Sequence, residues 1–189
     1  MIYKNKIFTD IDISGKDFND STFISCQFHN LTFRFTGFQN CTFRACSFTQ
    51  SLFTIVNFIN CSFPNSDLSR IDFSGTIIKK CDFSNSLMIG CTFAPSKDKT
   101  RSTKFDLTGH IFESTDFTQS LFNQCNLNGQ TFNDCNFEQV IFEKCDLIKT
   151  SFKNANLTST NFDSSLIKNT LLDINGFVQI GNSQGFTLN

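Results

Sequence analysis

The sequence lacks a dominant charge of one sign, a long apolar run and any familiar catalytic motif. Its 16 basic and 17 acidic side chains give a net charge of −1, which excludes the broad basic attraction of a protein that holds many phosphates. The apolar runs are only a few residues long, too short to cross a membrane. The opening MIYKNKIFTD has no secretory apolar segment, so we expect a soluble, cytoplasmic protein without membrane association.

What the sequence does contain is a large apolar residue at every fifth position. The series runs without a miss from Phe8 to Phe93, and a second series runs from Leu107 to Leu172. A helix repeats near 3.6 residues and a strand repeats at 2, so neither fits. Three extended residues followed by a two-residue turn do repeat at five, and the turn positions are rich in Ser, Asn, Asp, Thr and Gly. The period therefore predicts a solenoid with the large apolar residues along its axis.

All the cysteines lie two residues before one of these apolar residues. Elsewhere the same position often holds Ser, Thr or Ala, which indicates a small inward side chain. A free cysteine commonly behaves as a small buried hydrophobe, and no CxxC pair occurs. We therefore favour a core role over the alternative of a zinc or redox site, and predict no metal site. The cysteines are Cys26, Cys41, Cys46, Cys61, Cys81, Cys91, Cys125, Cys135 and Cys145.

The five-residue motif resembles that of the pentapeptide-repeat proteins. It reads as a small residue, then Asn, Asp, Ser or Thr, then Phe or Leu, then two polar residues, as in CTFRA, CDFSN and CNLNG. The resemblance covers roughly residues 6–174. It implies an all-β fold, a right-handed quadrilateral β-helix of about 8 coils with one loop insertion. We expect this β-helix to occupy residues 1–174 and a C-terminal cap or tail to occupy residues 175–189.

The repeat is interrupted once, by the segment APSKDKTRSTK at residues 94–104. One interpretation is a solvated surface insertion. The other is a partner-binding loop, because loops on a rigid scaffold often carry function. A weaker resemblance to the Qnr and MfpA-type members that protect DNA gyrase supports the second interpretation; it rests on the interrupting loop and on the run GKDFNDSTFISCQF. The predicted contact residues are Lys97, Lys99, Arg101 and Lys104.

Apolar residues at outward positions suggest a second contact surface. Phe35 and Ile55 are twenty residues apart at equivalent outward positions, with Leu52 beside them. An exposed apolar patch often marks a contact surface, although ordinary scatter of apolar residues is an equal alternative.

The C-terminal tail is the third candidate surface. It contains Gly176, Gly181 and Gly185 and shows no helical apolar stripe, so we expect an irregular or β-like cap. Its apolar residues could cover the last coil or pair with a second copy of the chain. The predicted cap or homodimer contacts are Phe177, Val178, Ile180 and Phe186.

Catalysis has no support in the sequence. His29 occupies a predicted turn, and His110 an inward position where a hydrogen-bonded core histidine is favoured over a general base. Phosphate loops, HExxH pairs and nucleophile elbows do not occur. We predict a non-enzymatic interaction scaffold without cofactors or direct nucleic-acid contact. The resemblance implies DNA gyrase or topoisomerase IV as its partner, protected from quinolones; the alternative is a module for an unrelated partner, such as a regulator or a bacterial effector.

Overall fold

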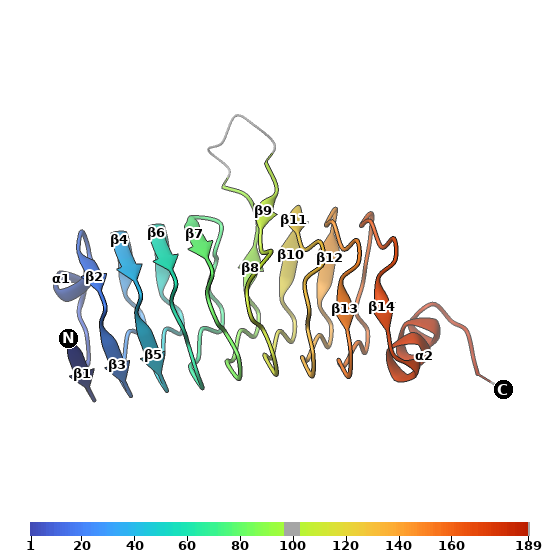
Figure 1. Cartoon of the computed structure of the whole chain (residues 1–189), viewed down its shortest axis with the longest axis horizontal. Coiled ribbons are helices and arrows are strands. Elements are labelled where there is room, and N and C mark those ends of the chain that lie inside the picture. The colour runs from blue at the N-terminus through green and yellow to red at the C-terminus, as the bar shows by residue number, and fades with distance from the viewer. Residues whose placement is uncertain (97–102, 189) are drawn as a thin grey trace.

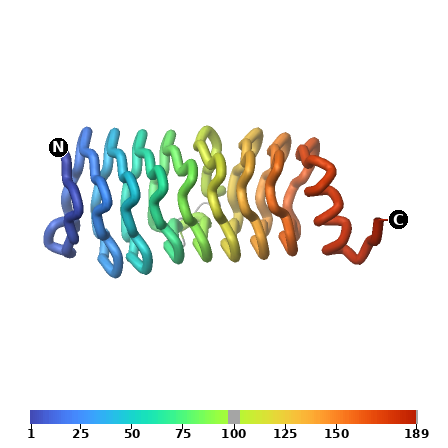
Figure 2. The backbone as a smooth tube through the Cα atoms, turned by 90° about the horizontal axis from the view of Figure 1, so that it is seen from below, coloured from blue at the N-terminus to red at the C-terminus, as the bar shows by residue number. Residues whose placement is uncertain are grey.

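The chain coils into a β-solenoid of about eight turns. The computed structural model describes residues 1–96 and 103–188. Figure 1 shows the coils side by side along the long axis, with the two termini at opposite ends, and Figure 2 shows the same stack from below. Paired strands are parallel and join residues twenty apart, such as Phe23 and Phe43, or 29 apart across the inserted loop, such as Thr92 and Leu121. Four five-residue repeats therefore complete one turn, and the predicted solenoid is confirmed.

The described strands are short and form parallel sheets on the faces of the solenoid. One sheet holds β1 (Ile2–Lys4), β3 (Thr22–Ile24) and β5 (Thr42–Arg44). A second holds β2 (Asp17–Asn19), β4 (Thr32–Gln39), β6 (Leu52–Ile59) and β7 (Thr76–Lys79). A third holds β8 (Thr92–Phe93), β10 (Leu121–Asn123) and β12 (Ile141–Glu143). Two pairs follow, β9 (Phe105–Asp106) with β11 (Cys125–Asn126) and β13 (Ser151–Phe152) with β14 (Leu171–Leu172).

The residue at the centre of each repeat points into the axis, as the period predicts. Phe23, Phe43, Phe63 and Phe83 are fully buried and form one column. Their successive ring centroids are 4.7, 4.9 and 4.9 Å apart, and the rings are nearly parallel. Stacking at the strand spacing of about 4.8 Å adds aromatic contact to the burial of apolar surface. The core therefore consists of columns of stacked side chains along the solenoid axis, not of a layer packed between two sheets or between a sheet and helices.

The small inward position two residues before each central residue is called the slot here. Every one of the nine slot cysteines is buried and donates its thiol to a main-chain carbonyl of the preceding coil, at 2.7 to 3.6 Å. Slot serines act alike: Ser66 Oγ donates to the Phe43 carbonyl and accepts the Cys46 N–H. The slot thus favours a small side chain, most often one that also donates a hydrogen bond.

The corners of the solenoid use a left-handed backbone. The second turn residue of most repeats has φ between +48° and +63°, and it is often Asn, as at Asn40, Asn60 and Asn85. L-residues other than Asn and Asp seldom adopt this conformation. The polar turn composition therefore reflects backbone geometry as well as solvent exposure.

One short helix replaces an extended side in the first coil. The helix α1 (Asp10–Ile13) begins after Thr9, whose main-chain N–H and hydroxyl both donate to the Asp12 carboxylate. Ile13 remains fully buried, so the inward series continues through the helix.

The predicted irregular or β-like C-terminal cap is wrong, because the tail forms the helix α2 (Ile174–Ser183). Asp173 caps it by accepting the Gly176 N–H at 2.8 Å. A Cβ at Gly176 would lie 3.1 Å from Leu157 Cδ1, so glycine lets the helix approach the last coils. This close packing offsets the low helix propensity of glycine. Gln179 Oε1 then accepts the Leu157 N–H, in place of a further coil.

The last coil departs from the inward prediction. Ile167, in the central position, is 56% exposed, and Phe162 and Leu172 are only partly buried. The reason is that α2 lies against Leu157 and leaves part of the open end of the core uncovered.

Candidate partner-binding site

The basic loop joins β8 to β9. Three of its predicted contact residues lie outside the described residues: Lys97, Lys99 and Arg101. Lys104 is exposed, and its ammonium contacts the Asp146 carboxylate. The described ends of the loop, at Pro95–Ser96 and Thr103–Lys104, border a cavity between β7 and β9.

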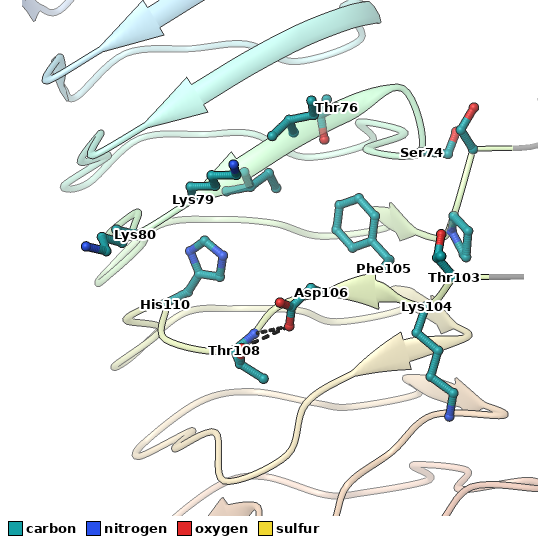
Figure 3. A pocket seen from close by; sticks show the side chains of 14 residues that line it. Ser74, Thr76, Lys79, Lys80, Thr103, Lys104, Phe105, Asp106, Thr108 and His110 are labelled. Atoms are coloured by element: carbon teal, nitrogen blue, oxygen red, sulfur yellow. Dashed lines mark hydrogen bonds between the residues drawn. The ribbon is translucent and has the colours of Figure 1, made fainter. Parts of the chain in front are cut away.

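This cavity of about 420 Å³ marks a break between two coils. The strand β7 ends one sheet and β9 begins another, so no ladder joins them. On the other three faces the same coils pair, through Asp82 with Ile111, Leu87 with Asp116 and Thr92 with Leu121. Figure 1 shows the ribbons of β7 and β9 farther apart than those of β6 and β7. Both strands consequently present an unpaired edge to the cavity. Figure 3 shows the side chains that line it.

The break coincides with a bulky slot residue, Phe105. The equivalent slots of the preceding coils hold Thr36, Val56 and Thr76, and that of the next coil holds Cys125. Coils about 4.8 Å apart leave no room for a ring in the slot. The Phe105 ring is half-buried and lies 6.4 Å from the Phe93 ring. A phenylalanine in the slot therefore wedges the two coils apart on this face.

Two other bulky slot residues also coincide with a break in the main-chain ladder of the described coils. Ile71 occupies the slot where the bridge between Leu52 and Asp72 is absent. At Gln130 the side-chain amide donates to the His110 carbonyl at 2.7 Å, where the Thr131 N–H would otherwise bind. A slot valine is tolerated, because the coil of Val56 remains paired. These breaks thus coincide with bulky slot side chains.

His110 is a slot residue that keeps its coil paired. Its Nδ1 accepts the Cys81 N–H at 3.0 Å, replacing the oxygen of a slot serine. Burial lowers the pKa of His110, so the ring is neutral and carries its proton on Nε2. The histidine lines the cavity, and the Asp106 carboxylate near it is bound by both donors of Thr108 and by the Asn126 amide. Figure 3 shows His110 and Asp106 on the same side of the opening.

A second opening of about 400 Å³ lies beside the predicted apolar patch. It separates the Leu52–Thr54 part of β6 from Asp72. Gly75 turns the chain tightly over β6 here, since a Cβ would lie 2.7 Å from the Phe53 carbonyl oxygen. The rings of Phe53 and Phe73 are perpendicular rather than stacked, as are those of Phe33 and Phe53 on the paired strands β4 and β6.

The structure brings two residues of the predicted apolar patch, Phe35 and Ile55, together at one corner of neighbouring coils. The register of β4 and β6 sets Phe35 opposite Ile55, and the two side chains are 60% and 54% exposed. Leu52, at the start of β6, is 65% exposed. Phe35 and Ile55 occupy left-handed corners with φ of +50° and +56°, a strained conformation for an aromatic and a β-branched residue.

Comparisons with known families agree with this architecture. Models described as pentapeptide repeats match residues 51–88 and 66–94, and a model of the pentapeptide repeat region matches residues 101–172. Together they cover more than half of the sequence. The chain belongs to the pentapeptide-repeat family. A model described as the SV2A/B/C luminal domain matches residues 1–68. No curated protein sequence matches the chain.

Solved structures similar to this pentapeptide-repeat protein include QnrB1, described as a plasmid-mediated fluoroquinolone resistance protein. A trypsin-treated variant of QnrB1 is 15% identical, with coverage of 100% of this chain and 99% of that chain and a TM-score of 0.58. Full-length QnrB1 is 16% identical, with 98% and 97% coverage and a TM-score of 0.53. HetL from the cyanobacterium Nostoc is 10% identical, with 91% and 87% coverage, and its TM-score of 0.37 is too low to support an argument. At these identities the likeness shows the fold alone.

The predicted C-terminal contacts separate into two groups in this pentapeptide-repeat protein. Ile180 packs against the core, and Val178 is partly buried. Phe177 and Phe186 are each 73% exposed and line an apolar groove of about 370 Å³ that also contains Ile167. The helical signal that sequence reasoning missed was the cap Asp173 followed by an apolar spacing of three and four residues.

The cysteines form no cluster with other ligands. No group of three or more His, Cys, Asp or Glu side chains able to hold a metal occurs in the described part of the chain. Burial raises the pKa of Cys46, Cys91 and Cys135 to about 12, so these thiols stay protonated and donate. Neither helix of the described chain has the length and hydropathy needed to cross a bilayer.

Proposed function

We propose that this pentapeptide-repeat scaffold is a non-enzymatic, protein-binding protein whose partner is DNA gyrase or topoisomerase IV, which it protects from quinolones. The observation that carries the proposal is the match over the full length of QnrB1, a fluoroquinolone resistance protein. A strongly basic segment, residues 94–104, separates the two repeat series and supports the same conclusion.

The contact surface in this proposal is the loop with the described Lys104 at its end. The solenoid core is filled by stacked rings, which makes the coils a rigid support for the loop. A loop on a rigid support binds with a smaller loss of conformational entropy than a free segment. Its positive charge favours an acidic surface on the partner.

A supercoiling assay tests the proposal. Purified gyrase is inhibited with a fluoroquinolone, and the intact protein is added in increasing amounts; we expect restored supercoiling. Replacement of Lys97, Lys99 and Arg101 by alanine should remove the effect. A control with the same charge change, Lys149, Lys153 and Lys168 to alanine, should retain it. No protection by the intact protein, with gyrase or with topoisomerase IV, would refute the proposal.

The alternative is a module for an unrelated partner, with the patch of Phe35, Leu52 and Ile55 as its surface. The exposure of all three side chains favours it. The double variant Phe35→Ser and Ile55→Ser leaves the loop intact, so the same assay separates the two surfaces: full protection by this variant would leave the patch free for an unrelated partner. Loss of protection in this variant would assign the topoisomerase contact to the patch.

Self-association through the C-terminal end completes the proposal. The groove beside Phe177 and Phe186 exposes apolar side chains, and Ile167 of the last coil lies open in it. A second copy seated on this end would cover all three. Light scattering of the protein should give the mass of a dimer, and the variant Phe177→Ser with Phe186→Ser the mass of a monomer. A monomeric intact protein would refute this part.

A further inference from the structure

The opening between β7 and β9 exposes main-chain groups that a further β-strand could pair with. Everywhere else on this face the coils join through main-chain bonds, as in β6 with β7 and β9 with β11. At the opening, the Lys80 N–H makes no main-chain bond to the described part of the next coil, whereas the equivalent N–H groups of Asn85 and Gly90 donate to Glu113 and Thr118. An edge strand offers alternating N–H and C=O groups, and here two edges face each other.

The geometry points to the insertion of an extended acidic peptide segment from a protein partner between β7 and β9. The unpaired edge of β7 offers main-chain groups such as the Lys80 N–H, which suits a peptide main chain better than a simple anion. The volume of about 420 Å³ lies within the range of about 300 to 1,000 Å³ typical of binding pockets. This inference rests on the protein-binding role proposed above, and it does not require the partner to be a topoisomerase.

The charge of the inserted segment follows from the rim of the opening. Lys79 and Lys80 are exposed at the end of β7, and both line the cavity. Neither takes part in a salt bridge with the described residues. The opposing carboxylate, Asp106, is already bound by Thr108 and Asn126, so it competes less for the two lysines. Acidic side chains on the segment would pair with these free ammonium groups.

Phe105 keeps the site open in this scheme. A ring in the slot prevents β7 and β9 from pairing with each other. Such pairing would otherwise satisfy the main-chain groups of both strand edges and close the site. A small residue at position 105 should let the coils close, because the slots of the coils on either side hold Thr76 and Cys125, which belong to paired strands. The wedge is therefore a positioning residue for the inserted segment.

Binding of a defined probe tests the inference. The probe is a fluorescein-labelled peptide, Thr-Val-Glu-Val-Glu-Val-Thr, titrated with the full chain and followed by anisotropy. We expect saturable binding that is lost when alternate amides of the peptide are N-methylated and when both Glu residues are replaced by Lys. The variant Phe105→Cys should bind at least about tenfold more weakly. The control Cys125→Ser, a slot change in a closed coil, should bind as the intact protein does.

Amide hydrogen exchange gives a readout that does not depend on any variant. Addition of the peptide should slow exchange at Ile78 and Lys80 and leave Asn85 unchanged. Absence of binding, equal binding of the N-methylated peptide, or unchanged exchange at Ile78 and Lys80 would overturn the inference. Its failure is separable from that of the proposed function: protection of gyrase without peptide binding would refute only the insertion, and peptide binding without protection would refute only the topoisomerase partner.

Discussion

The face of the solenoid that carries Phe23, Phe43, Phe63 and Phe83 and the places where the ladder breaks share one period but differ in the slot. On that face the slots hold Ser21, Cys41, Cys61 and Cys81, and the ladder is continuous. Elsewhere in the described coils, the slot residues Ile71, Phe105 and Gln130 each coincide with a break in the ladder. The five-residue period thus determines that the chain coils, while bulky slot side chains coincide with the breaks between neighbouring coils.

The largest expected effect comes from a charge in a regular column. Phe63 is fully buried between the rings of Phe43 and Phe83. Phe63→Asp would bury a carboxylate without a partner and should cost more than about 4 kcal/mol of unfolding free energy. Phe105→Asp, at the half-buried wedge, is the matched control and should cost far less. Circular dichroism and thermal melting measure both; an unchanged Tm of Phe63→Asp would contradict the columnar core.

A bulky residue introduced into a regular slot should reproduce the opening. Cys61→Leu removes the thiol that donates to the Phe38 carbonyl and overfills the slot. We expect a loss of about 1 to 3 kcal/mol and faster amide exchange at Phe43, whose N–H donates to the Ser62 carbonyl at 2.8 Å. Cys61→Ser keeps both the size and the donor and should melt close to the intact protein. If the Leu and Ser variants have equal exchange rates at Phe43, slot size does not control the ladder.

The solenoid itself could be predicted from the sequence because the period acts at every repeat. Each inward phenylalanine contributes the same contact with its neighbours twenty residues away, so no single position had to be interpreted correctly. The slot was predicted to be small for the same reason. The hydrogen bonds of the slot side chains explain why Cys, Ser and Thr are so frequent there, a reason that size alone does not give.

The openings and the cap could not be predicted in this way. Phe105 and Ile71 read as ordinary apolar residues unless their register against the slot is followed, and the loss of pairing depends on the preceding coil. The three glycines of the tail argued against a helix by propensity. At Gly176 the close contact with Leu157 overrides that propensity. The helix therefore depends on tertiary packing, which the local sequence does not reveal.

A smaller effect, confined to one pH range, should distinguish His110 from the serine and cysteine slots. Burial lowers the folded-state pKa of His110 below its usual value near 6.5, so the unfolded chain binds the proton more strongly. The contribution of neutral His110 to the free energy of unfolding is therefore fully present above the pKa that His110 has in the unfolded chain. It is lost as the pH falls from that pKa through the lower pKa of the folded protein. Thermal melts from pH 7.5 to 5.5 should show a steeper fall in Tm for the intact protein than for His110→Gln. The exposed His29 is common to both proteins, so parallel curves would contradict the assignment.

The smallest expected effect is a gain, at the corners of the apolar patch. Ile55 has φ of +56° and is 54% exposed, so its side chain makes little contact that would offset the strain of a β-branched residue in this conformation. Ile55→Asn should stabilise the protein by up to about 1 kcal/mol, since asparagine occupies the equivalent position of the next corner at Asn60. Leu52→Asn is the control, because Leu52 does not have a positive φ and should show no gain. A lower Tm for Ile55→Asn would mean that the exposed side chain contributes to folding. A higher Tm together with weaker binding of the partner would mean that the strain at this corner is retained for contact.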